Sequence, residues 1–431
     1  MANGRHIVTT RTPTPADLPA AQTAFRALVD RGLKLDLTRG KPAADQLDLS
    51  NDLLGFPGRA TFSDAAGTDL RNYGGPAGLP ELRALFAPFL QVPADRLLAL
   101  GNSSLTVMHD TVVHALLSEI PGAKRRWVEE QADTGIAFLC PVPGYDRHFS
   151  ICERFGIDMI PVPMTPDGPD MDVVERLAAS EPRIKGIWCV PKYSNPDGAV
   201  YSDATVRRLA EMPTAAPDFR IFWDNAYAVH HLTEEEVEIA DILAECEAAG
   251  HADRAFVFGS TSKVTFASAG VAFFGSSRAN VEWLQSKLAK STIGPDKVNQ
   301  LRHVIFLRDG DGLRALMARH RALLAPKFEA VDRILTERLG ASGEGPGEWT
   351  NPKGGYFISL RVPEGCAARV VALAKEAGIA LTPAGATHPY GQDPEDRTIR
   401  LAPTFATLAD VEAAVDGVAT CVQLAAAEKA V

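Results

Sequence analysis

Short apolar runs recur along the chain, and most are followed by turn residues and then by a stretch whose apolar positions have helical spacing. Continuous apolar runs of about four to six residues are typical of strands that are buried on both faces. Their alternation with helices is typical of an α/β fold with a mainly parallel sheet. The pattern predicts a seven-stranded sheet, with strands at Arg96–Leu100, Ala137–Cys140, Ile157–Val162, Gly186–Val190, Arg220–Trp223, Ala255–Phe258 and Val271–Phe274.

The pattern changes after residue 312. A long helix rich in Ala, Leu and Arg is indicated at Asp311–Leu339, and a loop with four glycines, Gly340–Gly347, follows it. Strands and helices then alternate in an α+β order, with strands at Gly355–Val362 and Thr398–Ala402 and helices at Ala367–Ala377 and Leu408–Ala427. We predict a large domain formed by residues 67–312 and a smaller α+β domain formed by residues 1–66 together with 313–431.

Composition narrows the class of protein. The 431 residues are 46% hydrophobic and 23% charged, which is ordinary globular usage, and the formal net charge is −10. This acidic balance argues against nucleic acid or an anionic membrane as the main partner. No apolar run reaches the roughly 18 residues of a membrane span, residues 1–14 lack the apolar core of an export signal, and the six cysteines are scattered. We expect a cytoplasmic enzyme that needs no metal.

Candidate chemistry follows the strands, because ligands of an open parallel sheet bind beyond the carboxyl ends of its strands. The first predicted strand is followed by Gly101-Asn102-Ser103-Ser104, which opens a helical pattern. Hydroxyls and free backbone amides at a helix N-terminus suit an oxyanion such as a phosphate. A simple serine N-cap explains the same residues, and on this stretch alone it is the better explanation.

Other strand ends carry further polar or aromatic side chains. Each has an ordinary explanation as packing, a turn, an ion pair or a solvated charge, but the parallel topology brings all of them to one edge of one sheet. Pyridoxal phosphate needs such a set: a ring to stack on, a carboxylate for its pyridinium nitrogen, donors for its phenolic oxygen and a lysine for a Schiff base. The residues are Tyr145, Asn195, Asp224, Tyr227 and the group Ser260, Ser262 and Lys263.

Six motifs in chain order resemble those of the fold-type I pyridoxal-phosphate enzymes, in particular the class I/II aminotransferases. The match covers nearly the whole chain, and its order makes it far more specific than any one motif. The segment Leu35-Asp-Leu-Thr-Arg39-Gly40-Lys41-Pro42 further resembles the MocR-like or type Ic aspartate aminotransferases. The six motifs are Asn72-Tyr73-Gly-Gly-Pro-Ala-Gly78-Leu-Pro-Glu-Leu-Arg83, Gly101-Asn-Ser-Ser104, Ser194-Asn-Pro-Asp-Gly198, Asp224-Asn-Ala-Tyr227, Ser260-Thr-Ser-Lys263 and Ile399-Arg400-Leu-Ala-Pro403.

The resemblance implies a role for each matching residue. Lys263 would form the Schiff base and shuttle the α-proton, while Asp224 would keep the ring nitrogen protonated. Asn195 and Tyr227 would bond the phenolic oxygen, and Tyr145 would stack on the ring. The serines Ser103, Ser104, Ser260 and Ser262 would bind the phosphate. Tyr73 would reach the phosphate of the neighbouring subunit, which implies a homodimer with shared active sites.

The resemblance also implies the reaction, the transfer of an amino group from an amino acid to a 2-oxo acid. Arg400 would hold the substrate α-carboxylate with a bidentate fork. We expect aspartate as donor and 2-oxoglutarate as acceptor. A second carboxylate needs a second cation, for which Arg39, Lys41 and Lys297 are candidates, and Gly40 would let the backbone approach the substrate.

One departure from the family pattern concerns the phosphate. The family commonly has an arginine shortly after the Schiff-base lysine, whereas this chain has Val264-Thr-Phe-Ala-Ser268-Ala-Gly270. The phosphate would therefore lose a cation there and could recruit another, such as Lys297.

Rival functions remain at this point. A pyridoxal-phosphate β-lyase that acts on cysteine conjugates could share every motif above. Ser260-Thr-Ser-Lys263 also matches the S-x-x-K of serine hydrolases, although the S-D-N and K-T-G tripeptides that accompany it are missing. A nicotinamide dehydrogenase is weaker still, because no G-x-G-x-x-G follows a strand. A transcriptional regulator would need a DNA-binding module, for which the pattern before Tyr73 gives no sign.

Overall fold

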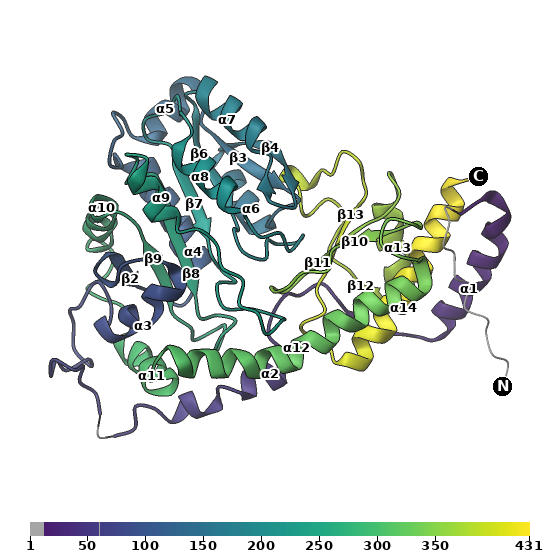
Figure 1. Cartoon of the computed structure of the whole chain (residues 1–431), viewed down its shortest axis with the longest axis horizontal. Helices are drawn as coiled ribbons and strands as arrows, with labels where there is room; N and C mark the ends of the chain where they lie inside the picture. The colour runs from purple at the N-terminus through teal and green to yellow at the C-terminus, as the bar shows by residue number, and fades with distance from the viewer. Residues whose placement is uncertain (1–12, 60) are drawn as a thin grey trace.

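A computed structural model describes residues 13–59 and 61–431 (Figure 1). Its main sheet has eight strands in the order β2-β9-β8-β7-β6-β3-β4-β5. Strands β3, β4, β6, β7 and β8 pair in parallel, while β9 runs antiparallel to both of its neighbours. The bounds are β2 Leu97–Ala99, β3 Ala137–Val142, β4 Asp158–Thr165, β5 Gly168–Pro169, β6 Ile184–Cys189, β7 Arg220–Asp224, β8 Ala255–Ser260 and β9 Ala272–Gly275.

The predicted α/β class and all seven predicted strands of this sheet are confirmed, with shifts of a few residues at their ends. The eighth strand, β5, was missed. It has two residues, Gly168 and Pro169, and pairs antiparallel with the end of β4. A glycine and a proline give no apolar run, so only the tight turn back along β4 creates this strand.

Alternate residues of the central strands enter two hydrophobic cores, one on each face of the sheet, as the two-residue period of a strand requires. Leu139, Ile221 and Val257 belong to one core, whereas Phe138 and Phe222 belong to the other. Helices α3 (Pro80–Leu90), α7 (Met171–Ser180), α8 (Asp203–Glu211), α9 (Ile242–Ala248) and α11 (Lys297–Leu307) cover the first face. Helices α4 (Ser104–Leu117), α5 (Trp127–Thr134), α6 (Asp146–Phe155) and α10 (Arg278–Leu288) cover the second.

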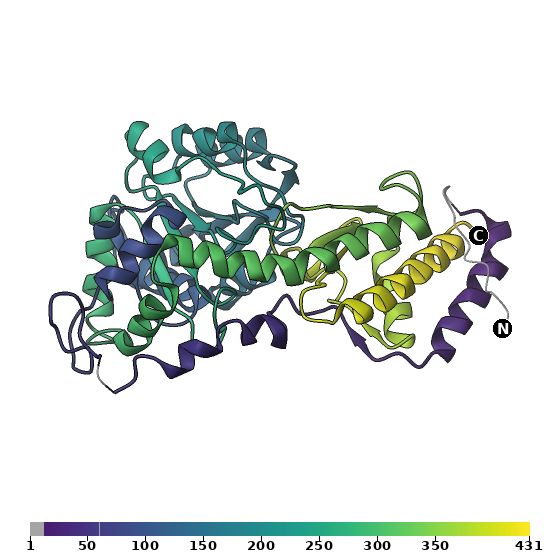
Figure 2. The ribbon, with the colours of Figure 1, turned by 60° about the horizontal axis from the view of Figure 1, so that its bottom comes forward.

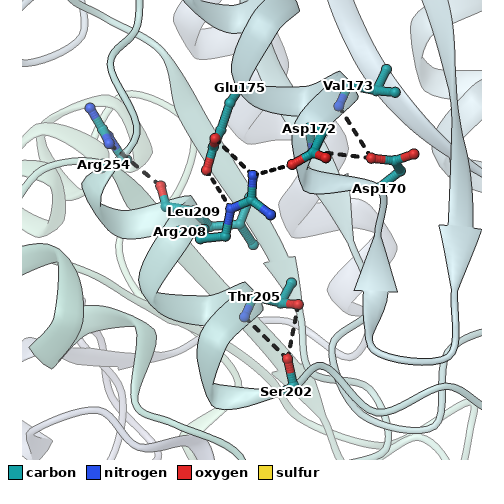
Figure 3. A network of polar contacts seen from close by, with 9 residues as sticks. All are labelled: Asp170, Asp172, Val173, Glu175, Ser202, Thr205, Arg208, Leu209 and Arg254. Atoms are coloured by element: carbon teal, nitrogen blue, oxygen red, sulfur yellow. Dashed lines mark hydrogen bonds and ion pairs between the residues drawn. The ribbon is translucent and has the colours of Figure 1, made fainter.

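Caps and ion pairs fix two of these helices beside each other (Figure 3). Asp170 caps α7 by accepting from the backbone N–H groups of Asp172 and Val173. Ser202 caps α8 by accepting from the backbone N–H of Thr205. Arg208 of α8 reaches across to α7, where it donates to Glu175 and Asp172 at 2.6–2.9 Å. None of these residues lines the cavity described below, and their contacts serve packing.

A separate core lies beside the main sheet, at the right of Figure 1. It contains residues of helices α1 (Leu18–Asp30), α13 (Ala367–Glu376) and α14 (Leu408–Lys429) and of the antiparallel sheet β10-β11-β13. The strands are β10 Glu348–Trp349, β11 Ile358–Arg361 and β13 Thr398–Leu401, and a parallel pair is formed by β1 (Leu35–Asp36) and β12 (Ile379–Ala380). The predicted helices and longer strands of this region are confirmed, whereas the two-residue strands were not foreseen.

Helix α12 (Gly310–Leu339) links the two parts, as Figure 2 shows. Its first third packs Leu313 and Leu316 into the core of the main sheet, and its second half packs Val331 and Leu335 into the separate core. The short helix α2 (Ala44–Asp48) is followed by Leu49, which packs against the main core although it precedes residue 67. The domain bounds at 66/67 and 312/313 stay a prediction, and we propose that α12 belongs to both domains.

Within the described residues, no helix is long and apolar enough to span a membrane. Residues 1–12 of the predicted signal-free terminus lie outside the described part of the chain.

Candidate active site

A cavity of about 560 Å³ opens at the carboxyl ends of the parallel strands, between the main sheet and the separate core. Segments far apart in the chain meet there, as the predicted topology requires. Several predicted site residues do not line it: Ser103, Ser260, Ser262, Tyr73 and Lys297. Those that do are Arg39, Gly40, Lys41, Ser104, Tyr145, Asn195, Asp224, Tyr227, Lys263 and Arg400.

Asp224 ends strand β7 and is almost fully buried. Its Oδ2 is 3.0 Å from His148 Nε2, and the His148 ring stacks on Trp188 of β6 with centroids 4.4 Å apart. Its Oδ1 is also buried and has no hydrogen-bond partner among the described residues. A buried carboxylate oxygen without a partner is costly, so Asp224 is prepared for a donor that enters the cavity.

Lys263 follows strand β8, and its amine lies beside two stacked aromatic rings, those of Tyr227 and Tyr356. Nζ is 5.1 Å from the ring centre of Tyr227 and 5.8 Å from that of Tyr356. Burial lowers the pKa of Lys263, and the nearby Asp224 charge opposes that effect in part. An amine with a lowered pKa is more often unprotonated near neutral pH, which makes it a better nucleophile and proton carrier.

The phenols of the site stay protonated. Burial raises the pKa of Tyr227 well above its ordinary value, and the phenol of Tyr145 and the charge of Asp224 add to this effect. Burial likewise raises the pKa of Tyr145. Both hydroxyls are therefore hydrogen-bond donors at neutral pH.

The serines predicted to bind phosphate come together from two loops. Ser103 caps α4, with its Oγ 3.5 Å from the Thr106 N–H, and Ser104 begins the helix. Ser260 Oγ donates to Ser262 Oγ (3.1 Å), and Ser262 Oγ donates to the carbonyl of Asn102 (3.3 Å). The serine N-cap is thus real, and it places the N-terminus of α4 beside the loop that carries Lys263.

Arg400 extends from strand β13 and is buried. Its Nη1 donates to Asp146 Oδ1 at 3.0 Å and to Asn195 Oδ1 at 3.4 Å, and the guanidinium lies over the Phe357 ring. Its Nε is buried without a partner among the described residues. One edge of the guanidinium is therefore available for a carboxylate.

The three candidate cations for a second carboxylate have different surroundings. Arg39 and Lys41 line the cavity, with Arg39 Nε 3.7 Å from Asp36 and Lys41 Nζ 4.0 Å from the centre of the Phe405 ring. Lys297 lies elsewhere, because its ammonium donates to the carbonyls of Asn72 (3.1 Å) and Gly74 (2.6 Å). Lys297 therefore holds the loop of Tyr73 and does not line this cavity, and its suggested contact with a substrate or with the phosphate stays a prediction.

Gly40 lines the cavity, and packing also requires its lack of a side chain. A Cβ at this position would overlap the Phe357 ring, so the absence of a side chain lets Phe357 lie beneath Arg400. Direct contact between the Gly40 backbone and a substrate stays a prediction.

Sequence reasoning missed the residues that surround the predicted ones. Asp146, Arg147 and His148 form the first turn of α6, and all three act at the site: Asp146 on Arg400, Arg147 as a cavity wall and His148 on Asp224. Their place directly after Tyr145 could have marked them as candidates for the site. Only the three-dimensional placement of α6 shows which partner each one contacts.

Tyr73 is 81% exposed. Its loop is held by the two bonds from Lys297 and by a bond from the Gly74 N–H to the Ile293 carbonyl. The predicted contact of Tyr73 with a neighbouring subunit's phosphate stays a prediction.

Comparison with known proteins agrees with this geometry. The model of the aspartate amino-transferase family matches residues 10–431. An aspartate aminotransferase from Corynebacterium glutamicum is 51% identical over 404 residues, which cover 94% of this chain and 92% of that protein. A Mycolicibacterium smegmatis protein assigned to the aminotransferases is 57% identical over 409 residues, or 94% of each protein.

The crystal structure of an aspartate transaminase from C. glutamicum superposes with a TM-score of 0.94 at 49% identity, covering 96% of this chain and 97% of that one. The expected fold-type I architecture is thereby confirmed. These similarities support neither a serine hydrolase nor a β-lyase. In addition, the Ser260 hydroxyl donates a hydrogen bond to Ser262 Oγ rather than to Lys263. The chain belongs to the aspartate aminotransferase family, and it is an aminotransferase.

Proposed function

We propose that this aminotransferase uses pyridoxal phosphate, takes aspartate as its preferred amino donor and passes the amino group to 2-oxoglutarate. The observation that carries the cofactor assignment is the buried, unpartnered Oδ1 of Asp224 in a cavity that Lys263 also lines. A pyridinium N–H would satisfy that oxygen. The names of the C. glutamicum proteins support the choice of aspartate, and the segment 35–42 supports the narrower type Ic assignment.

The residues present fit this cofactor. Asp224 would hold a proton at the ring nitrogen, and His148 would keep the carboxylate oriented through its hydrogen bond to Oδ2. Tyr227 and Asn195 would donate to the phenolic oxygen, and Tyr145 would cover the ring. The N-terminus of α4 with Ser103 and Ser104, together with Ser260 and Ser262, would bind the phosphate.

When bound, pyridoxal phosphate supplies an electron sink for the bond that breaks at the substrate α-carbon. The chain supplies the proton transfer and the alignment. Lys263 Nζ is the amine for covalent attachment, and afterwards the base that takes the α-proton and returns it one step later. Arg400 binds the α-carboxylate through its free edge, which orients the α-carbon towards Lys263.

A dicarboxylate donor needs a second cation, and Arg39 and Lys41 remain the candidates that the geometry favours. Both lie on the wall formed by the segment Thr38–Lys41. The exposed Arg147 lines the cavity too and joins them as a third candidate.

We also propose a homodimer in which Tyr73 completes the site of the partner subunit. The exposure of Tyr73 on a loop tied down by Lys297 supports this proposal. The six unpaired, buried cysteines are compatible with a cytoplasmic location.

Borohydride reduction of the protein loaded with pyridoxal phosphate, followed by peptide mapping, tests the assignment. We expect the label on Lys263. Lys263→Ala should lose the label and the transaminase activity and still bind the cofactor, because the ring and phosphate contacts remain. A label on another lysine would contradict the proposal.

An amino-donor screen with 2-oxoglutarate as acceptor tests the substrate. Aspartate and glutamate should give the highest kcat/KM. If alanine or aromatic donors exceed both, the dicarboxylate assignment fails, and release of pyruvate and ammonia from a cysteine conjugate would favour a β-lyase.

A further inference from the structure

Three buried polar side chains meet near Lys263, and none of them lines the cavity. They are Gln46 of α2, His320 of α12 and Tyr356, which precedes β11. Each is at most 1% exposed, so their hydrogen bonds are made almost without competition from water. They come from three distant parts of the chain, and nothing in the reaction described above uses them.

The direction of the hydrogen bonds follows from the Gln46 carboxamide. Its Oε1 accepts from the Ala43 N–H at 3.1 Å, which leaves Nε2 as the donor. Nε2 lies 3.1 Å from Tyr356 Oη and 3.1 Å from His320 Nδ1. One amide group therefore donates to both a phenol and an imidazole.

These two acceptors pass the bonds on to the backbone at Lys263. Because His320 Nδ1 accepts, its Nε2 carries the proton and donates to the Val264 carbonyl at 3.0 Å. Burial lowers the pKa of His320, in spite of the bond to the Val264 carbonyl, and this favours the neutral ring that such an arrangement needs. Tyr356 Oη accepts from Gln46, so its own proton points to the Lys263 carbonyl at 3.5 Å.

We call the hydrogen bonds from Gln46 through Tyr356 and His320 the relay. Its other end reaches the cavity wall. Ala43, whose N–H fixes the Gln46 amide, comes two residues after Lys41. The segment Thr38–Lys41 lines the cavity, and Lys41 itself is held where its carbonyl accepts from Thr404 Oγ1 at 3.2 Å. Gln46 thus connects the wall that a substrate would touch with the backbone carbonyls of the consecutive residues Lys263 and Val264.

We propose that Gln46 is a positioning residue for Lys263, acting through Tyr356 and His320. The proposal rests on the function proposed for Lys263. These hydrogen bonds hold the backbone of Lys263 in place, so that the amine keeps its position beside the rings of Tyr227 and Tyr356.

The test compares Gln46→Met with a matched control, Gln91→Met. Both changes replace a glutamine by an uncharged side chain of similar length. Gln91 Nε2 donates to the Ile239 carbonyl at 2.8 Å, outside the site. Both variants lose hydrogen bonds, so both lower the free energy of unfolding, but only Gln46→Met should loosen Lys263.

The first measurement needs no cofactor. Amine modification of the full-length apoprotein with trinitrobenzenesulfonate is followed over pH, and the label on Lys263 is quantified by peptide mapping. Burial lowers the pKa of Lys263, so a loosened and better hydrated lysine should show a labelling midpoint at least about half a pH unit higher in Gln46→Met. Gln91→Met should keep the wild-type midpoint.

The second measurement uses the protein loaded with pyridoxal phosphate. We expect kcat to fall about tenfold in Gln46→Met, with the donor KM within about twofold, because misplacing a reacting group mainly affects the chemical step. Tyr356→Phe removes the contact with the Lys263 carbonyl directly and should shift the midpoint in the same direction. The double variant should shift it by less than the sum.

A Gln46→Met protein with an unchanged Lys263 midpoint and kcat would overturn the proposal. Should Gln46→Met fail to fold, Tyr356→Phe decides, and an unchanged midpoint in that variant overturns it as well. Failure of the proposed function would look different: reductive labelling of the loaded wild-type protein would miss Lys263, whereas the apoprotein midpoints would still report on the relay.

Discussion

The Arg400 guanidinium already has hydrogen-bond partners before any substrate binds. Its Nη1 donates to Asp146 and Asn195, while Nε is left without a partner. Asp146 also lies near a second cation, with its Oδ2 4.0 Å from Arg147 Nε. A carboxylate that binds Arg400 must therefore share the guanidinium with Asp146 or displace it towards Arg147. At the scale of single residues, the charge that binds the substrate is already partly neutralised by a neighbouring side chain.

Replacing Asp146 by asparagine should strengthen binding of the substrate carboxylate. Asp146 is about one-third exposed, so its ion pair with Arg400 contributes about 0–1 kcal/mol, and its loss should lower the donor KM by up to about fivefold. Steady-state kinetics at two salt concentrations would measure this, with kcat changing less than KM. A clear rise in KM would mean instead that Asp146 mainly orients the guanidinium.

Lys192 gives the protein a pH dependence that is opposite to that of ordinary surface lysines. It is 8% exposed, and its Nζ donates to the Ala228 carbonyl at 2.8 Å. Burial lowers the pKa of Lys192 from 10.5 to about 8, against the opposing charges of Glu236 and Glu238. Between pH 8 and pH 10.5, Lys192 is protonated in the unfolded chain and mostly unprotonated in the folded one. The unfolded chain therefore binds more protons, and the free energy of unfolding rises with pH.

We therefore predict that Lys192→Met removes a rise in stability between pH 8 and pH 10.5, a rise of up to about 3 kcal/mol in the wild-type protein. Urea unfolding of both proteins across this range gives the difference, in which the contributions of other groups cancel. A constant difference would show that Lys192 titrates at its ordinary pKa in the folded protein.

At the scale of elements, caps determine where helices begin. Asp170 accepts from two backbone N–H groups at the start of α7. Asp170→Ala should therefore lower the free energy of unfolding by about 1 kcal/mol, without affecting the active site. Asp203→Ala is the control, because Asp203 lies in the first turn of α8, where Ser202 provides the cap. Chemical denaturation should rank Asp170→Ala as the more damaging change, and equal losses would contradict the role of the cap.

The strands that form the site could be predicted because each is a long enough apolar run to be buried on both faces. Once their parallel order is accepted, the residues after them must meet, which is why Asp224 and Lys263 were candidates by position, while their roles came from the resemblance to the aminotransferases. Strands of two residues, such as β5 and β12, have no such run, since pairing with a neighbour creates them. They could be seen only in the folded chain.

The rest of the site could not be predicted, because it depends on how a helix is rotated about its axis and on how far a flexible side chain extends. His148 meets Asp224 because α6 turns one particular face to the sheet. The Lys297 ammonium donates to the carbonyls of Asn72 and Gly74, and no pattern in the sequence indicates these two partners. Gln46 gave no signal at all, because a buried glutamine is recognised only by its partners.

At the scale of the whole molecule, the proposed shared site predicts complementation between two inactive variants. In a hybrid dimer of Lys263→Ala and Tyr73→Ala subunits, one site would combine the intact Lys263 of one chain with the intact Tyr73 of the other. A hybrid purified through two different tags should recover about half of the wild-type activity. If Tyr73 served only its own subunit, the hybrid would stay inactive.

Both parts of the molecule share α12, so neither can move far without bending or tilting a thirty-residue helix. The separate core contains the first and the last helices of the described chain, α1 and α14, packed against each other. During synthesis on the ribosome, the apolar face of α1, with Ala21, Phe25 and Leu28, emerges early and has no α14 to cover it.

The main sheet is completed by residue 275 and can form while that face is still exposed. Helix α14 can dock on α1 only after Leu408–Lys429 has been synthesised. Because Arg400 lies on β13 and the wall Thr38–Lys41 follows α1, the pocket for the substrate is closed last, after the lysine and its carboxylate partner are already in place. In nascent chains of this enzyme, the residues that would bind the cofactor should therefore fold before the pocket that selects the substrate is complete.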